Sequence, residues 1–373
     1  MIKRRLYVVV AAYGYGNPGD DACAVSARYL ILKSDPTAKV IITSPPFDEE
    51  LVKNADAVIL GGGGTLYDLT SENVTNYMKY LEYAQQHKKL TAAIGIGTQG
   101  IHTDWGKKYY NKVLNKCNLV TTRSFEDTAV LHEIGVKKAI TTQDLGFVVD
   151  DAVFGNTQVK RNILRLMRIK DRVPEQQPTL GLSLIDFTAT PYGSNLIGKE
   201  EFDELAKGCR LAIDKYLPKL KECYGVKLII QSRDDRKYCE ELSRRFNIKI
   251  LDYKSPSDLP NLLRNYAMFD AIFTMRFHPI IFGSLSNKPV FSMAGPGSKH
   301  EKLISGIDSI NNHQEVISQN SIEKHLERVI TTEHKPISLQ DLQNMKRLAL
   351  MNIGLLRNMV TYGPSIQRLP SIV

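Results

Sequence analysis

Short runs of β-branched and aliphatic residues alternate with longer amphipathic stretches from one end of the chain to the other. In the first half this pattern predicts strands at 6–12, 40–43, 57–60, 90–95, 119–122 and 139–142, with helices at 21–33, 74–88 and 127–134. In the second half it predicts strands at 179–184, 227–231, 249–251, 271–274 and 289–292, with helices at 201–224, 236–245 and 259–269. Strands that alternate with helices form βαβ units and mostly parallel sheets. Because there are two such series, we expect an α/β fold of two doubly wound domains that face one another across a cleft.

The length of the chain supports the same division. Its 373 residues exceed what one hydrophobic core usually serves, since domains commonly hold about 100–200 residues. The break between the two series falls between Asp151 and Pro178. We therefore expect an N-terminal domain at 1–155, a linker at 156–178 and a C-terminal domain at 179–335. The remaining residues, 336–373, carry apolar positions at helical spacing and are expected to form a helical tail that packs back on the protein.

The linker contains a basic stretch at 160–172 in which Asp171 is the single acid. Ile163, Leu166 and Met167 share one face of a helix there, so an amphipathic helix on an anionic membrane surface is one interpretation. A solvated connector between the domains is the other. The whole chain has 49 Lys and Arg against 40 Asp and Glu, a net charge of +9, which favours anionic partners.

Several classes of protein are excluded by composition. With 43% hydrophobic and 24% charged residues the chain is globular, and no uncharged apolar run approaches the length of about 20 residues that a membrane span needs. The five cysteines contain no CxxC pair, which is typical of a reducing compartment. The first apolar run has no small-residue cleavage site, so we interpret it as a core strand and expect a cytoplasmic protein. Basic residues punctuate glycine-rich loops and form no stripe, which argues against nucleic acid as a partner.

Unusual residues gather after the predicted strands, where ligands of open α/β sheets bind. These segments, expected to be loops, are 14–21, 61–68, 95–100 and 123–124 in the first half, and 231–235, 275–278 and 295–300 in the second. Several glycine-rich loops at one edge of a sheet would form the floor of a cleft, where a ligand approaches the backbone closely. We expect the functional site along these edges.

The first loop matches the dinucleotide fingerprint GxGxxG, but its details disfavour a nicotinamide or flavin cofactor. The acid expected at the end of the second strand is replaced by Thr43-Ser44-Pro45. Asp20 and Asp21 occupy the helix N-terminus, where they would repel a phosphate. Asp20 is expected to cap the helix, a role compatible with Asn17 or Asp20 lining a sugar pocket. We expect no cofactor.

Asp68 lies four residues after a run of four glycines, 61–64. A merely exposed acid would not require such a run before it. A carboxylate above a backbone turn can accept a proton or a hydrogen bond from a hydroxyl group. We therefore expect Asp68 to be catalytic, with Gly63 and Gly64 in contact with substrate.

Arg276 and His278 form the sharpest local constellation. At the end of a strand, residues two apart point to the same side, so these side chains are expected to project together. A guanidinium binds a carboxylate or phosphate in bidentate fashion, and an imidazole carries a proton near neutral pH. Pro279 is expected to start the next helix at its first residue.

Three further residues are candidates for binding an anion. Arg123 follows a strand in the first half and is expected either to clamp the anion or to form a surface ion pair. Lys299 and His300 follow a Gly-Pro-Gly turn and could form a phosphate cradle. The other histidines show no pairing that suggests a metal site, and the HExxH, GxxxxGK[ST] and GxSxG motifs are absent. We therefore expect no metal.

Taken together, five blocks of the sequence resemble the polysaccharide pyruvyl transferase family. Their order and spacing match over residues 7–310. The blocks are Gly16-Asn17-Pro18-Gly19-Asp20, the 61–64 run with Leu66 and Asp68, Gly95-Ile96-Gly97, Thr122-Arg123-Ser124 and Met275-Arg276-Phe277-His278.

The resemblance implies two Rossmann-like domains arranged as in GT-B glycosyltransferases. It implies transfer of the pyruvyl group of phosphoenolpyruvate to two hydroxyls of a sugar, in a cell-surface polysaccharide such as an exopolysaccharide or in its lipid-linked precursor. A pyruvate ketal forms and phosphate is released. The acceptor would bind the N-terminal domain and phosphoenolpyruvate the C-terminal domain. With a lipid-linked acceptor, 160–172 would contact the inner face of the membrane.

The family's active-site residues correspond to Asp68, Arg123, Arg276 and His278. In the implied mechanism the two arginines hold the carboxylate and phosphate of the donor, His278 is the general acid and Asp68 the general base. The chain departs from the family at Phe277, where Leu is usual, and at Asp144-Leu145, where Asp-Pro is usual. A third departure, the segment 295–299, leaves open whether Lys299 takes the role of the family's lysine.

Two other functions stay open from the sequence. A GT-B glycosyltransferase that uses a sugar nucleotide would share the two-domain frame. A non-catalytic binding protein of a polysaccharide-assembly complex is the alternative from a different class. The presence of Asp68, Arg276 and His278 argues against the non-catalytic protein.

Overall fold

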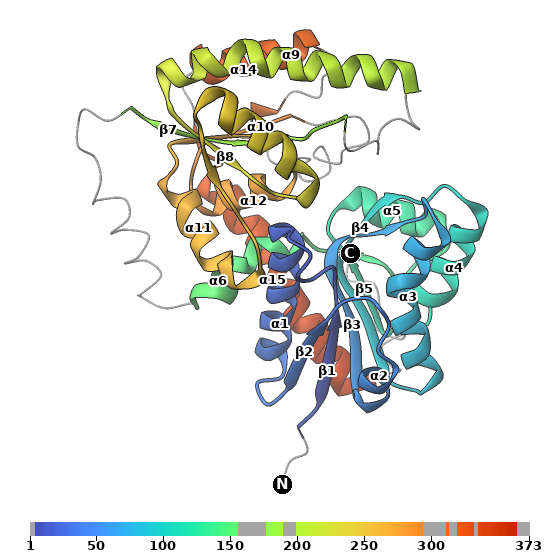
Figure 1. Ribbon diagram of the computed structural model, residues 1–373. Helices are drawn as coiled ribbons and strands as arrows, with labels where there is room; N and C mark the ends of the chain where they lie inside the picture. Colours follow the sequence, from blue (N-terminus) through green and yellow to red (C-terminus); the bar gives the residue numbers. More distant parts are fainter. Residues whose placement is uncertain are drawn as a thin grey trace. The chain divides into compact units, whose positions relative to one another are not determined.

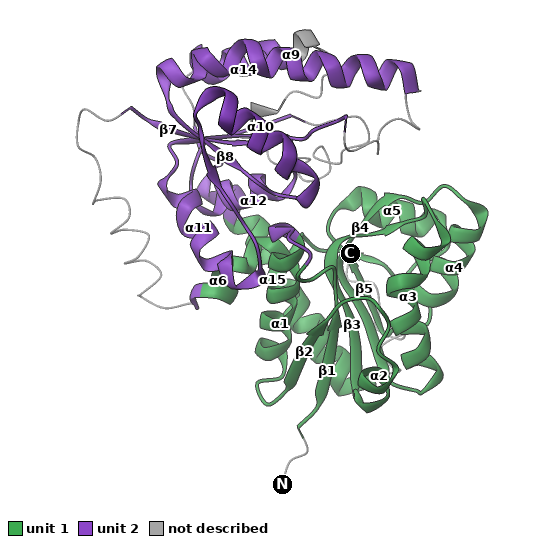
Figure 2. Cartoon of the chain, in the orientation of Figure 1, with its two compact units in different colours: residues 1–14, 20–153, 343–373 green, residues 15–19, 154–342 purple. Residues whose placement is uncertain are grey.

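The computed structural model describes residues 4–155, 177–188, 199–293, 311–312, 319–331 and 335–363 (Figure 1). The chain forms two compact units, coloured separately in Figure 2. Unit 1 comprises residues 1–14, 20–153 and 343–373, and unit 2 comprises 15–19 and 154–342. The C-terminal segment thus returns to the unit that begins the chain. The basic stretch 160–172 lies outside the described residues.

Unit 1 contains a six-stranded parallel sheet in the order β2-β1-β3-β4-β5-β6. Its strands are β1 (Leu6–Val10), β2 (Lys39–Thr43), β3 (Ala57–Tyr67), β4 (Leu90–Gly100), β5 (Leu119–Thr122) and β6 (Ile140–Thr141). Its helices are α1 (Pro18–Ser34, whose first two residues belong to unit 2), α2 (Glu49–Asn54), α3 (Ser71–Gln86), α4 (Asp104–Leu114), α5 (Phe125–Glu133), η1 (Leu145–Val148), α6 (Val149–Phe154, whose last residue belongs to unit 2) and α15 (Leu339–Tyr362, from residue 343 on).

The side chains of this sheet alternate between two buried faces, as expected for strands that helices cover on both sides. Val8, Val10 and Leu60 belong to the cluster that includes the buried residues of α3 and α4. On the other face, Val9 lies next to Ala27 of α1. Each face is therefore closed by its own helices, and unit 1 has its own core.

The glycine runs after the third and fourth predicted strands are not loops, which corrects the sequence prediction. Both runs continue their strands, and Gly61 pairs with Ile94 and Gly63 with Ile96, with shifts of register further along. Gly62 and Gly63 have φ of +76° and +80°, a conformation that suits glycine, and a Cβ at Gly62 would lie 3.0 Å from Leu145 Cδ1. Because they lack side chains, the glycine runs leave room for the buried side chain of Leu145 where β3 and β4 pair.

Helix α15 is attached to unit 1 by a buried amide. Asn352 is fully buried, and its Oδ1 accepts a hydrogen bond from Thr121 Oγ1 at 2.7 Å. Its Nδ2 donates to Thr142 Oγ1 at 3.3 Å, and Thr121 Oγ1 itself accepts from the backbone N–H of Gly95 at 2.8 Å. This chain of hydrogen bonds joins α15 to β4 and β5 and satisfies polar groups that have no access to water.

Unit 2 contains a second six-stranded parallel sheet in the order β9-β8-β7-β10-β11-β12. Its strands are β7 (Thr179–Ser183), β8 (Gly225–Ile229), β9 (Lys249–Leu251), β10 (Ala271–Thr274), β11 (Val290–Ser292) and β12 (Asn311–Asn312). Its helices are α9 (Lys199–Cys223), η3 (Arg233–Asp235), α10 (Arg236–Phe246), η4 (Pro256–Asp258), α11 (Leu259–Met268), α12 (His278–Leu285) and α14 (Gln319–Thr331).

Each predicted strand is present in one of the two sheets, and β12 is a strand that the sequence pattern did not predict. In unit 2 the strand order, counted along the chain, is 3-2-1-4-5-6, which is the order of dinucleotide-binding Rossmann domains. The core of this unit packs α9, α10 and α14 against the sheet; α9 and α14 lie side by side in Figure 1. The prediction of two doubly wound, Rossmann-like α/β units is confirmed.

No helix in the described part of the chain is long and apolar enough to cross a membrane.

We predict that the substitution Asn352→Ala lowers the free energy of unfolding by about 1–3 kcal/mol, because the buried hydroxyl of Thr121 loses its acceptor and the buried hydroxyl of Thr142 loses a donor. Asn358→Ala, at an exposed position of the same helix, is the matched control and should change stability by less than about 0.5 kcal/mol. Urea denaturation measures both. Equal stability of the two variants would show that the buried amide does not hold α15 in place.

Candidate functional site

Both sheets have a point at which the strand order reverses, and ligands of such folds bind beyond the carboxyl ends of the strands at this point. In unit 1 the reversal lies between β1 and β3, and in unit 2 it lies between β7 and β10. The segments that follow β1 and β3 contain Asn17, Asp20 and Asp68, and the segment after β10 contains Arg276 and His278. The fold thus places the predicted residues at the edges where ligands are expected.

The segment before α1 forms a tight turn. Asn17 is half-buried, and its Oδ1 accepts a hydrogen bond from the backbone N–H of Gly19 at 3.0 Å. Helix α1 begins at Pro18, so Asp20 lies inside the first helical turn and is not the N-cap that the sequence predicted. Asp20 Oδ1 lies 3.4 Å from where a Cβ on Gly63 would stand, so the two expected substrate contacts are neighbours in unit 1.

Gly64 is covered by the side chain of Gln99, with which any Cβ at position 64 would collide. The backbone of Gly64 is therefore approached by a side chain of its own unit. Gln99 is itself exposed at the end of β4.

Asp68 is buried and binds the segment that leads into α4. Its carboxylate accepts hydrogen bonds from the backbone N–H of His102 at 2.9 Å, from the backbone N–H of Thr103 at 2.6 Å and from Thr103 Oγ1 at 2.7 Å. Burial alone would raise the pKa of Asp68, but these hydrogen bonds lower it below the ordinary value of an aspartate. Asp68 is therefore a weaker base than an ordinary carboxylate, and its contacts fix the start of α4.

Arg123 is also buried, between two carboxylates. Its Nη1 donates to Asp144 Oδ2 at 3.4 Å, and its Nε lies 3.6 Å from Asp127 Oδ2. Gly97 is stacked against the guanidinium so closely that a Cβ there would collide with it. Arg123 thus forms ion pairs inside unit 1, and the surface ion pair considered from the sequence is corrected to a buried one.

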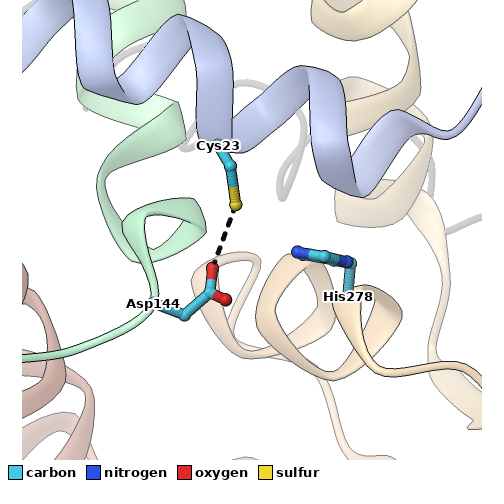
Figure 3. Close-up of side chains that lie close together, drawn as sticks. All are labelled: Cys23, Asp144 and His278. Atoms are coloured by element: carbon cyan, nitrogen blue, oxygen red, sulfur yellow. Dashed lines mark hydrogen bonds between the residues drawn. The ribbon is translucent and has the colours of Figure 1, made fainter. Parts of the chain in front are cut away.

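The two acids around Arg123 also bind the backbone. Asp127 Oδ1 accepts from Thr98 N at 2.9 Å and from Thr98 Oγ1 at 2.8 Å, which ties α5 to β4. Asp144 Oδ1 accepts from Gly146 N at 2.8 Å and from the Cys23 thiol at 3.4 Å, the contact drawn in Figure 3. Burial raises the pKa of the Cys23 thiol well above its ordinary value, so this cysteine is a neutral donor.

In unit 2, Arg276 follows β10 and is oriented by Asp235. Its Nε donates to Asp235 Oδ2 at 3.0 Å, and its Nη2 also donates to this fully buried carboxylate. Burial raises the pKa of Asp235, and the guanidinium opposes that shift. The side chain of Arg276 is 24% exposed. Asp235 holds the guanidinium along its Nε–Nη2 edge, and no hydrogen bond joins Nη1 to another described residue, so this edge can bind an anion.

His278 is the first residue of α12 and is half-buried. Its ring contacts Phe277 edge to face at 5.2 Å and stacks on Phe282 at 6.2 Å. The ring also lies against Gly19, which belongs to unit 2, and no side chain would fit at that position. These contacts hold the imidazole at the end of β10.

Arg276 and His278 do not lie on a strand, contrary to the prediction from the sequence. Strand β10 ends at Thr274, so Arg276 lies in a bend and His278 already in a helix. The bend is fixed by Thr274, whose Oγ1 accepts from Arg276 N at 2.8 Å and donates to Arg276 O at 2.8 Å. Pro279 is the second residue of α12 and not the first. Strand alternation therefore does not describe these two residues, which lie in a strand-to-helix turn.

Lys299 and His300, the expected phosphate cradle, lie outside the described residues. Among the described cations of unit 2, Arg233 is exposed in the segment after β8, and its side chain lies 3.2 Å from the place of a Cβ on Gly16.

Sequence reasoning missed three carboxylates that organise these edges: Asp127, Asp144 and Asp235. Asp144 was noticed only as a departure from the family pattern. For Asp127 a signal was present, because Ser124 and Asp127 have the spacing of a capping box, and Ser124 Oγ indeed accepts from Asp127 N at 3.1 Å. No local sequence pattern indicated a role for Asp235, since its partner Arg276 is 41 residues away.

The fold defines a class of proteins with two Rossmann-like units. The UDP-GlcNAc 2-epimerase of Neisseria meningitidis, solved with UDP-GlcNAc bound, has a TM-score of 0.56 at 12% identity, over 95% of this chain and 98% of that one. The UDP-N-acetylglucosamine 2-epimerase of Rickettsia bellii has a TM-score of 0.58 at 12% identity, over 98% and 99%. The UDP-GlcNAc 2-epimerase of Methanocaldococcus jannaschii has 0.54 at 12%, over 97% and 100%. At this identity the likeness concerns the fold alone.

The family is shown by sequence. The family model of polysaccharide pyruvyl transferase matches residues 17–295, about three quarters of the chain, and the chain belongs to that family. It is therefore a transferase that acts on polysaccharides. No curated protein sequence matches the chain.

We predict that Asp68→Asn destabilises unit 1 by about 1–3 kcal/mol at neutral pH, because an amide cannot accept all the hydrogen bonds that the carboxylate accepts. The folded carboxylate has the lower pKa, so its contribution to stability is present above the pKa of the unfolded chain and is lost as the pH falls through the folded value. The gap in stability between wild type and variant should therefore close below about pH 4.

Thermal unfolding between pH 3 and pH 8 measures this effect. Asp104→Asn, an exposed acid in the first turn of α4, is the control and should show a smaller loss. A gap for Asp68→Asn that is independent of pH would contradict the assignment of an ionised, hydrogen-bonded carboxylate.

Proposed function

We propose that this protein transfers the pyruvyl group of phosphoenolpyruvate to two hydroxyls of one sugar, in a cell-surface polysaccharide or its lipid-linked precursor, with formation of a ketal and release of phosphate. The position of Arg276 supports the proposal. This residue follows β10 at the switch point of unit 2, the buried Asp235 orients its guanidinium, and His278 is two residues further along the chain. A fixed guanidinium beside an imidazole suits a small anion that must be protonated during the reaction.

In the proposed mechanism, the Nη1 edge of Arg276 binds the carboxylate or the phosphate of the donor. His278 gives a proton to the methylene carbon, and the cationic C2 that results is attacked by the first sugar hydroxyl. The second hydroxyl of the same sugar then displaces phosphate from C2. One hydroxyl proton restores His278 and the other leaves with the phosphate, so that the ketal and hydrogen phosphate are the products.

The residues of unit 1 receive positioning roles in this proposal. Arg123, expected to bind the donor, has its charge balanced by Asp127 and Asp144, so it supports the ends of β4 and β5. Asp68, expected to be the general base, has a lowered pKa and several donors, so it positions the segment after β4. We assign the acceptor sugar to this unit, with Asp20 and Gly63 after neighbouring strands.

The test is acceptor-dependent release of phosphate from phosphoenolpyruvate, screened over galactose-, mannose- and glucosamine-type acceptors. His278→Gln should lower kcat by about 10²–10⁴-fold, because it removes a general acid. His87→Gln, at an exposed histidine of α3's C-cap, is the control and should keep normal turnover. Near-normal turnover of His278→Gln would contradict the assignment.

Arg276→Lys should raise KM for phosphoenolpyruvate by about ten-fold or more, since an ammonium keeps the charge and loses the fixed fork that Asp235 orients. Arg244→Lys, at an exposed position in the last turn of α10, is the matched control with unchanged KM. If a uridine nucleotide protects the fold from heat and phosphoenolpyruvate does not, a sugar-nucleotide glycosyltransferase replaces this proposal. Failure to release phosphate with any acceptor would favour a non-catalytic binding protein.

A further inference from the structure

The chain contains a single tryptophan, Trp105, in the first turn of α4 and 45% exposed. Its indole stacks on the ring of Tyr109, with centroids 5.5 Å apart and an angle of 18° between the planes. Tryptophan is enriched at binding surfaces, because its large flat ring buries much apolar area on contact and its N–H can still donate a hydrogen bond. With one face on Tyr109, the indole has its other face available for a ligand.

Glu82 of α3 holds the stacked rings of Trp105 and Tyr109 in place. The hydroxyl of Tyr109 donates to Glu82 Oε2 of α3 at 2.6 Å, and Lys112 Nζ donates to Glu82 Oε1 at 2.7 Å. Burial raises the pKa of Tyr109, and the hydrogen bond and the charge of Glu82 raise it further, which keeps its hydroxyl a donor. The stack therefore has little freedom to rearrange, and a rigid surface loses less entropy when it binds a ligand.

The N-terminal end of the same helix is fixed by Asp68. The hydrogen bonds from His102 and Thr103 to Asp68 hold the two residues just before α4, and Thr103 Oγ1 accepts from the N–H of Gly106 at 3.0 Å as the N-cap. Gly106 is itself packed on Asp68, since a Cβ there would lie 2.5 Å from Asp68 Oδ2. The buried carboxylate thus determines where Trp105 is presented.

Polar groups accompany the indole at this edge of the sheet. His102 is exposed three residues before Trp105, with its ring on Gly100, and Gln99 is exposed at the end of β4 with its amide on Gly64. Leu69, directly after Asp68, adds an apolar side chain that is 53% exposed. A pyranose ring has an apolar C–H face and a rim of hydroxyls. The indole suits the apolar face, and the imidazole and amide of the adjoining segment suit the hydroxyls.

We propose that Trp105, stacked on Tyr109, is the platform on which the acceptor saccharide lies, with His102 and Gln99 binding its hydroxyls. The identity of the saccharide as an acceptor rests on the proposed function, whereas the binding of a saccharide does not. The Asp68 carboxylate is a positioning residue for this platform.

The single tryptophan makes the proposal directly measurable, because fluorescence excited selectively at tryptophan reports on Trp105 and not on the 17 tyrosines. Titration with the methyl glycosides of galactose, mannose and N-acetylglucosamine should give a saturable change for at least one of them. The absence of any change with all three would overturn the proposal.

Variants then assign the binding to the indole, with calorimetry as the readout. Trp105→Ala should weaken binding of the responding glycoside about ten-fold or more, and Trp105→Phe should restore most of it because a flat ring is retained. Tyr362→Ala, an exposed aromatic residue at the end of α15, is the matched control and should bind as wild type. Wild-type binding by Trp105→Ala, with its melting temperature unchanged, would overturn the proposal.

Glycoside binding and phosphate release together distinguish a failure of this saccharide site from a failure of the proposed transferase reaction. If the glycoside binds at Trp105 but phosphoenolpyruvate releases no phosphate, the saccharide site stands and the proposed function is wrong. If phosphate is released and Trp105→Ala leaves KM for the acceptor unchanged, the transferase stands and this site is wrong.

Discussion

Parallel pairing of the strands is the constraint on which the rest of this structure depends. In both units every strand pairing is parallel, so all carboxyl ends within a sheet meet at one edge. The polypeptide must leave that edge and return over a face of the sheet, which leaves backbone N–H groups and helix N-termini directed at the same region. Whatever polar side chains follow the strands are brought together there, however distant they are in sequence.

Buried carboxylates hold the segments at these sheet edges in place. Asp68 binds the segment before α4, Asp127 binds β4, and Asp144 and Asp235 each bind an arginine. Each has donors to replace water, as a buried charge requires. The residues that stand out in the sequence thus include some that hold the edge and some, such as Arg276, that stay partly exposed.

The sequence pattern was sufficient for the fold because strands and helices of this kind have different hydrophobic periods. The strands 119–122, 249–251 and 271–274 were predicted with the bounds that the structure has. The prediction was wrong for the glycine runs, which look like loops by composition. They continue as strands because β3 and β4 lie side by side and each supplies the hydrogen bonds that the other lacks. A single segment carries no information about such a partner.

The sequence by itself determined the alternation of strands and helices, the two α/β units and the residues that would follow each strand, since these depend on local periodicity and on the chemistry of glycine and proline. Only the tertiary structure decided how far each of the candidate side chains is buried and which charges surround it. Arg123 and Arg276 look alike in sequence, each one residue or two past a strand. Arg123 meets two acids in a buried site, whereas Arg276 meets one acid along one edge and remains partly exposed. The difference arises from partners up to 41 residues away, which pair only after the sheets have formed.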